Sequence, residues 1–186
     1  EQSLAAVRQA AQLKLVVAVP GTVIANDWSV WVYPAVETPA PTGDVAVLNT
    51  IGAPLYQALR AGKRVLLLPP EGSLAKPLRG RFIPVFWSPL HFPNQPGTLG
   101  ATIESRHPVF ALFPTETFTD WQWWDLLADS VAADLTAARV KPAMPFRFVD
   151  KFNRNALPAA IFEARVGTGR LLVCTLDVSH DLATRP

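Results

Sequence analysis

The stretch from residue 44 to residue 70, DVAVLNTIGAPLYQALRAGKRVLLLPP, decides the predicted fold of most of this chain. Residues 44–48 form a short apolar run, and residues 51–61 carry apolar side chains at helical spacing. Residues 65–68 form a second, continuous apolar run that two prolines end. Strand, helix and strand with short links make a βαβ unit, and continuous apolar strands are typical of parallel sheets. The stretch therefore predicts an α/β fold.

Strands that would complete this sheet are predicted further along the chain, at residues 82–87, 132–136, 146–150, 159–166 and 170–176. The last two are separated by the sequence Gly-Thr-Gly, which predicts a tight hairpin turn. We assign residues 44–186, from the first apolar run to the end of the chain, to one module that contains this sheet.

The region before the sheet contains two more strand candidates, residues 13–19 and 28–33. Two strands are too few for a stable domain, so we interpret residues 1–36 as the terminal strands of a β-sandwich. The proline-rich residues 37–43 read as a linker. The first residues have no features of a signal peptide, and we expect the chain to be a piece of a longer protein.

The composition argues against several classes of partner and site. Of the 186 residues, 49% are hydrophobic and 17% are charged, which is typical of a globular chain. A formal net charge of +2 without a basic run gives no reason to expect nucleic acid. No apolar run reaches the roughly 18 residues that a membrane span needs. A single cysteine excludes an intrachain disulfide, and no phosphate-binding or zinc-binding spacing predicts a cofactor.

Residues 118–127, FTDWQWWDLL, hold three of the six tryptophans of the chain. Thr119 as N-cap with Gln122 three residues later has the spacing of a capping box, which predicts a helix from Thr119. Apolar residues wrap more than one side of this helix, so packing in the core or between domains is the favoured interpretation. The alternative is a platform for sugar stacking, which needs an exposed indole face. Its carbohydrate-binding residues would be Trp87, Glu116, Asp120, Trp121, Trp123 and Trp124.

A polar loop, the single cysteine and the three histidines are further candidates for a site. Interface candidates in the polar loop after residue 149 are Asp150, Asn153, Arg154 and Asn155, which we interpret as an inter-domain patch of salt bridges and hydrogen bonds. Cys174 lies within an apolar run and reads as an inert core thiol. The three histidines lie far apart in the sequence and predict no metal site. No catalytic residue is predicted.

Several blocks of the sequence are similar to one known family. They are residues 26–34 (NDWSVWVYP), 62–69 (GKRVLLLP), 84–87 (PVFW), 113–116 (FPTE), 120–124 (DWQWW) and 162–174 (FEARVGTGRLLVC). Their order along the chain resembles the C-terminal region of bacterial family-two glycoside hydrolases, the β-galactosidase-like multidomain proteins. The resemblance covers nearly the whole chain, and the blocks at residues 28–34 and 120–124 are its most specific parts.

The resemblance implies a fold for each part. Residues 1–36 would finish an immunoglobulin-like β-sandwich. Residues 44–186 would be a three-layer, flavodoxin-like module with a mostly parallel sheet, similar to class I glutamine amidotransferases. Those enzymes place a cysteine on an elbow between strand and helix, whereas the only cysteine here, Cys174, lies in a predicted hairpin strand.

The resemblance also implies a function. The catalytic glutamates of such hydrolases lie on a barrel for which this chain has no room, so the chain would be a non-catalytic accessory domain. Its partners would be other domains of the same polypeptide, carbohydrate, or a second copy in a homo-oligomer. Its location would be periplasmic or secreted. The alternatives are a carbohydrate-binding module with exposed tryptophans and a small amidotransferase-like hydrolase.

Overall fold

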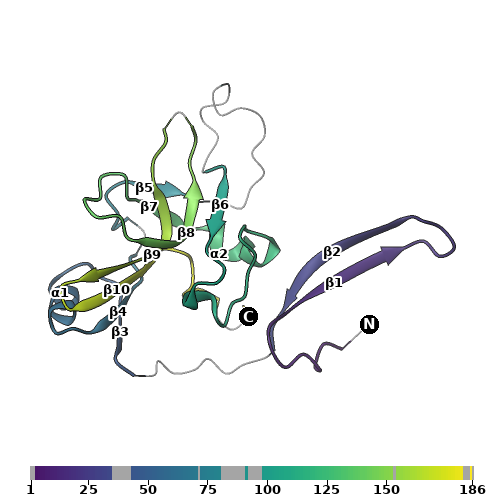
Figure 1. Ribbon diagram of the computed structural model, residues 1–186, viewed down its shortest axis with the longest axis horizontal. Helices are drawn as coiled ribbons and strands as arrows, with labels where there is room; N and C mark the ends of the chain where they lie inside the picture. The colour runs from purple at the N-terminus through teal and green to yellow at the C-terminus, as the bar shows by residue number, and fades with distance from the viewer. Residues whose placement is uncertain are drawn as a thin grey trace.

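The computed structural model describes residues 3–34, 43–70, 72–80, 91, 98–152, 154–181 and 185. These residues form a two-stranded hairpin and an eight-stranded mixed sheet (Figure 1). The elements are β1 (Ala11–Ala18), β2 (Ala25–Val32), β3 (Val45–Leu48), α1 (Ala53–Arg60), β4 (Arg64–Leu67), β5 (Pro77–Arg79), β6 (Gly100–Ile103), the 3-10 turns η1 (Pro108–Phe110) and η2 (Trp121–Trp123), α2 (Trp124–Ala128), β7 (Val131–Asp134), β8 (Ala143–Val149), β9 (Pro158–Val166) and β10 (Gly169–Cys174). The predicted strand at residues 82–87 and the linker residues 37–42 lie outside the described residues.

The βαβ prediction for residues 44–70 is confirmed. β3 and β4 are parallel neighbours, and α1 lies between them in the chain. Leu55 and Leu59 of α1 are buried in one cluster with Val65, Leu67 and Val173 of the strands beneath. Burial of these aliphatic side chains is the main stabilising contribution at this end of the sheet, since each contributes roughly 1.5–3 kcal/mol.

The prediction of a three-layer, flavodoxin-like module with a mostly parallel sheet is wrong. The sheet order is β3-β4-β10-β9-β7-β5, and β8 pairs with β9 and with β6. Among the described strands, only the β3–β4 and β4–β10 pairs are parallel, whereas every pair beyond β10 is antiparallel. After β4, the described residues form strands, 3-10 turns and the five-residue α2 rather than long crossover helices. The described residues hold just two α-helices, neither of them long and apolar enough to cross a membrane.

The strands predicted at residues 146–150, 159–166 and 170–176 are confirmed as β8, β9 and β10, with boundaries that differ by up to three residues. β9 and β10 pair antiparallel and are joined by Gly167 and Thr168, as the predicted hairpin requires. Gly167 has φ +62°, a left-handed conformation that suits the tight turn and that glycine adopts without strain. The strand predicted at residues 132–136 is β7, which begins and ends slightly earlier.

The main core lies between the sheet and the segment that contains η1, η2 and α2. Trp123, Leu127, Phe146 and Ala160 are each at most 1% exposed and belong to this cluster. The Trp123 ring contacts the rings of three phenylalanines, with centroids 4.9 to 6.1 Å away. The tryptophan segment therefore covers the sheet where a crossover helix was expected.

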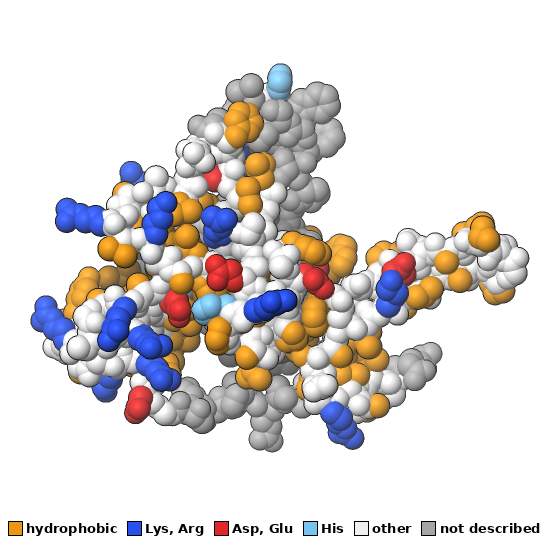
Figure 2. All heavy atoms as spheres, in the orientation of Figure 1, with side chains coloured by type: hydrophobic (Ala, Val, Ile, Leu, Met, Phe, Trp, Pro, Cys, Tyr) orange, Lys and Arg blue, Asp and Glu red, His pale blue; other side chains and the backbone are white. Residues whose placement is uncertain are grey.

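The N-terminal region forms a two-stranded hairpin, and its assignment to the end of a β-sandwich stays a prediction. β1 and β2 pair antiparallel over their whole length, and no other described strand pairs with them. The register gives the hairpin two unlike faces. One face, called the apolar face below, carries Leu13, Leu15, Val17, Trp28, Val30 and Val32 together with Asn26; the other, polar face carries Gln12, Lys14, Asp27, Ser29 and Trp31 together with Val16. The hairpin extends away from the sheet, and apolar side chains line it in the space-filling view (Figures 1 and 2).

Candidate functional site: the tryptophan block and its hairpin

The tryptophan block, residues 118–128, begins differently from the prediction. Asp120, not Thr119, is the N-cap, and its Oδ1 accepts a hydrogen bond of 3.3 Å from the backbone N–H of Gln122. The first helical residues form the 3-10 turn η2, and the α-helix α2 spans five residues. The predicted capping box is absent because the Gln122 side chain is used elsewhere, accepting from Tyr33 and donating to the carbonyl of Pro114.

The three tryptophans of the block have different environments. Trp123 is 1% exposed, and its Nε1 donates to Thr115 Oγ1 at 2.9 Å, so it is a core residue and offers no face to a sugar. Trp121 and Trp124 are 64% and 50% exposed, with ring centroids 6.1 Å apart and planes inclined by 34°. The two interpretations of the block therefore apply to different residues. Trp87, the fourth tryptophan considered, lies outside the described residues.

The polar groups of the block bind the base of the hairpin. Trp31 Nε1 donates to Asp120 Oδ2 at 2.8 Å, and Tyr33 Oη donates to Gln122 Oε1. The Tyr33 ring also stacks on Phe113, with centroids 5.6 Å apart and planes inclined by 12°. Partial burial and the nearby charge of Asp120 raise the pKa of Tyr33, so its hydroxyl remains a hydrogen-bond donor at physiological pH. Asp120 is thus a contact to the hairpin.

Glu116 also faces the hairpin. Its Oε1 accepts a long hydrogen bond of 3.5 Å from Gln12 Nε2. Gln12 and Trp31 are cross-strand partners and therefore lie on the same, polar face of the hairpin. That face is held against the body at its base, whereas the apolar face remains uncovered: Leu15, Val17 and Trp28 are 55%, 57% and 42% exposed.

Sequence reasoning missed Trp31, Tyr33 and Gln122 as contact residues. A signal was present, because Trp31 and Tyr33 stand two residues apart and so share one face of a strand. What the sequence did not carry was the partner, since Asp120 and Gln122 lie about 90 positions further along the chain.

The predicted interface residues Asp150 and Arg154 bind one another. Both Asp150 oxygens accept from Arg154 Nε at 3.0 Å, and Asp150 also accepts from the backbone N–H of Ala156. Asn155 has φ +51°, which fits the tight loop that this ion pair closes. The structure does not describe Asn153. The loop is therefore braced internally.

We expect Asp150→Ala to lower the free energy of unfolding at pH 7 by about 1–3 kcal/mol, because the Arg154 and Ala156 donors lose their acceptor. Burial raises the pKa of Asp150, but its hydrogen bonds to Arg154 and Ala156 outweigh this effect and hold the pKa below the ordinary value of an aspartate. The stabilisation is complete above the unfolded pKa and is lost as the pH falls through the folded one. Urea unfolding measures the difference in unfolding free energy between the unsubstituted chain and Asp150→Ala. This difference should be smaller at pH 3 than at pH 7, and an equal difference at both pH values would contradict the prediction.

A second cluster lies where β3, β4 and β10 end. Asp177 Oδ1 accepts from His180 Nδ1 at 2.6 Å, and Asp177 Oδ2 accepts from Arg185 Nη2 at 3.1 Å. These residues line a cavity of about 1070 Å³ together with Cys174. Burial alone would raise the pKa of Asp177. Its hydrogen bonds to His180 and Arg185 outweigh burial, so the pKa lies below the ordinary value of an aspartate. An ionised Asp177 therefore organises the end of the chain.

Cys174 does not have the properties of a nucleophile. It lies in β10, is buried, and burial raises its pKa to about 11. At neutral pH the thiol is protonated, and reactive cysteines need the opposite. Within the described part of the chain, no group of three or more His, Cys, Asp or Glu residues could hold a metal ion. The geometry argues against the amidotransferase-like alternative and offers binding surfaces instead.

Comparison with known proteins divides the chain at the same place as the structure. Residues 1–34, which contain the hairpin, match a family model described as domain of unknown function DUF8488. Residues 46–186, which contain the mixed sheet and the tryptophan block, match a second model, described as domain of unknown function DUF8487. No curated protein matches the chain. Because the second model spans well over half of the sequence, the chain belongs to the DUF8487 family.

Proposed function

We propose that this chain is a non-catalytic accessory domain of a β-galactosidase-like glycoside hydrolase, in which it makes contacts between domains. The observation that carries the proposal is the contact between the two most specific blocks of the resemblance. Trp31 and Tyr33 of the block at residues 28–34 bind Asp120 and Gln122 of the block at residues 120–124. On this proposal the two motifs hold the hairpin in place. The location of the protein would be periplasmic or secreted.

The hairpin supplies the contact surface of this proposal. Its polar face is fixed to the tryptophan block, and its apolar face presents Leu15, Val17 and Trp28 to solvent. An isolated two-stranded ribbon is marginally stable in water, and an exposed apolar face of this kind normally marks an interaction site. The occupant we propose is a neighbouring domain of the same polypeptide, which would bury the apolar face.

The test compares two hairpin variants, each made both in the complete multidomain polypeptide that we propose, called the parent below, and in the present chain alone. We expect Val17→Lys with Val30→Lys, on the apolar face, to lower the Tm of the parent by several degrees and to leave that of the present chain nearly unchanged. The matched control, Ser29→Lys on the opposite face, should change neither. Equal behaviour of the two faces in the parent would overturn the proposal. Dimerisation of the present chain that the Val17→Lys variant abolishes would make a second copy the occupant.

The non-catalytic part of the proposal has its own measurement. The chain should release no product from a panel of aryl glycosides, including aryl β-galactosides, above the rate of a heat-denatured sample. Turnover that survives purification to homogeneity would contradict a purely accessory role.

A second candidate function, carbohydrate binding, is favoured by Trp121 and Trp124. These neighbouring indoles are at least half exposed, as a stacking platform requires. Titration with oligosaccharides should then quench tryptophan fluorescence, and Trp121→Ala or Trp124→Ala should remove the quenching while Trp28→Ala on the hairpin leaves it. A glycan panel with no fluorescence change and no calorimetric heat would argue against this function.

A further inference from the structure

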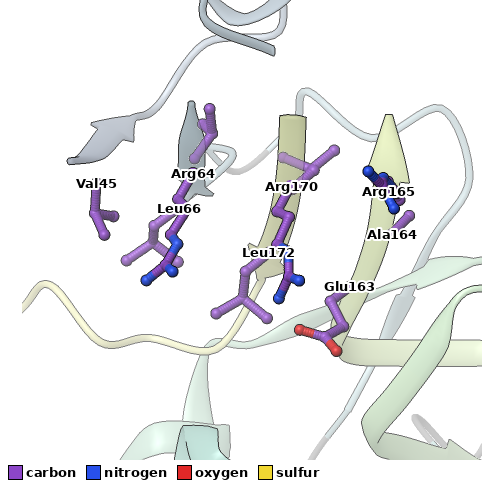
Figure 3. Close-up of a pocket in the computed structure, with 10 residues that line it drawn as sticks. Val45, Arg64, Leu66, Glu163, Ala164, Arg165, Arg170 and Leu172 are labelled. Atoms are coloured by element: carbon purple, nitrogen blue, oxygen red, sulfur yellow. The ribbon is translucent and has the colours of Figure 1, made fainter. Parts of the chain in front are cut away.

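One face of the β3-β4-β10-β9 sheet carries a row of arginines. Arg170 is the register partner of Arg64 on β4 and of Arg165 on β9. Cross-strand partners project to the same side, so the three side chains share one face, at spacings of about 4.8 Å between strands. They line an open groove of about 480 Å³, and Arg64 and Arg170 point to one side of the sheet in the close-up (Figure 3).

None of the three guanidinium groups forms an ion pair with a residue that the structure describes. The one carboxylate lining the groove, Glu163, lies one row further along the sheet, and its Oε1 is 3.4 Å from His107 Nε2. Like charges directly opposite on neighbouring strands destabilise a sheet. Lys and Arg side chains also gather over this end of the molecule in the space-filling view (Figure 2).

The row next to the arginines is apolar on β3, β4 and β10, and it continues on β9 with Glu163, the register partner of Leu172. Val47, Leu66 and Leu172 are register partners across β3, β4 and β10, and Val47 is 48% exposed. The opposite face of these strands is covered by α1 through Val65, Leu67 and Val173. On the arginine side, the main core packs against Leu66 and Leu172 as well as against Leu68 and Cys174, so the two groove leucines are partly covered by it. The groove therefore combines a basic row with two partly buried leucines, Leu66 and Leu172.

We propose that this groove docks an acidic amphipathic α-helix presented by a partner protein. Arginine is the cation best suited to carboxylates, because its planar guanidinium binds them through two parallel hydrogen bonds and is weakly hydrated. The apolar row matches the leucine stripe of such a helix, and a helix packed on a sheet is the standard way to cover an open face. The apolar row also argues against a free inorganic anion or an acidic polysaccharide, neither of which would gain from covering leucines.

The test measures binding of a defined probe by fluorescence anisotropy. The probe is an 18-residue synthetic helix with leucines three and four positions apart and glutamates flanking them. We expect it to bind the chain, and expect Arg64→Glu with Arg170→Glu to weaken binding at least tenfold. The matched control is Arg8→Glu with Arg139→Glu, which changes the net charge equally at exposed arginines outside the groove and should leave the affinity within twofold.

A second variant separates binding from folding. Arg170→Gln removes the central charge, and we expect it to raise the Tm of the free chain by about 1–3 °C, because repulsion in the row is relieved, while it weakens probe binding. Loss of binding together with a lowered Tm would assign Arg170 a structural role and overturn the proposal.

Two control ligands complete the design. A probe with lysine in place of glutamate should not bind, and neither should oligogalacturonate or sodium sulfate at equal charge concentration. Binding of oligogalacturonate or sulfate without binding of the glutamate helix would overturn the proposal in favour of a non-protein anion. Binding of neither class would overturn it outright.

Discussion

Replacing Trp123 with alanine should lower the free energy of unfolding by about 3–5 kcal/mol, the range for truncation of a large buried aromatic side chain. Trp123 is 1% exposed and fills the space between Phe110, Phe113 and Phe146. The substitution also leaves Thr115 without the indole donor that it binds at 2.9 Å. Urea denaturation at pH 7, followed by circular dichroism, measures this change.

The matched control is Trp121→Ala, two residues earlier in the same turn. Trp121 is 64% exposed, so its removal creates no cavity and should change the free energy of unfolding by less than about 1 kcal/mol. Equal losses for the two variants would mean that the block is not divided into one core tryptophan and two surface tryptophans.

Gly169→Ala should destabilise the chain by several kcal/mol and sharply reduce its soluble expression. A Cβ at this position would lie 2.6 Å from the carbonyl oxygen and 2.8 Å from the Cα of Leu59, and 3.0 Å from the carbonyl oxygen of Lys63. These are backbone atoms of the end of α1 and of the turn after it, so no flexible side chain can move aside. Overpacking of this kind costs typically 1–3 kcal/mol even where the neighbours can adjust.

Gly52→Ala is the control for this prediction. Its Cβ would meet only Pro54 Cδ at 3.9 Å and Thr50 Cγ2 at 4.0 Å, which is ordinary van der Waals contact. We expect the melting temperature of the Gly52→Ala variant to stay within about 2 °C of that of the unsubstituted chain, since the position is open. A Gly169→Ala protein that melts like Gly52→Ala would show that α1 can move away from β10 at little cost.

Local patterns in the sequence predicted the elements whose causes are local. The strand–helix–strand unit at residues 44–70 follows from apolar spacing over short distances, and the β9–β10 turn follows from Gly167. The parallel, three-layer arrangement did not follow, because strand direction depends on which strands meet. β10 pairs parallel with β4 but antiparallel with β9, and both pairings suit the same apolar sequence.

The tryptophan block shows the same limit at the level of single residues. Trp121 and Trp124, three positions apart, are both exposed on the surface, whereas Trp123 is buried. Which group faced the core was decided by the phenylalanines around Trp123, which come from other parts of the chain. Capping failed as a guide for a related reason: Gln122 is used by Tyr33, a residue nearly ninety positions earlier.

The carboxylate of Asp120 has two tasks, one for each oxygen. Oδ1 caps the turn that presents Trp123 to the core, and Oδ2 binds the indole N–H of Trp31 in the hairpin. Because one rigid group serves both, a displacement that breaks the hairpin contact also disturbs the cap, and an intact cap preorganises the acceptor for the hairpin. Folding of the turn and seating of the hairpin are therefore thermodynamically coupled. Strain that a neighbouring domain applies to the hairpin would reach the centre of the hydrophobic core through this single side chain.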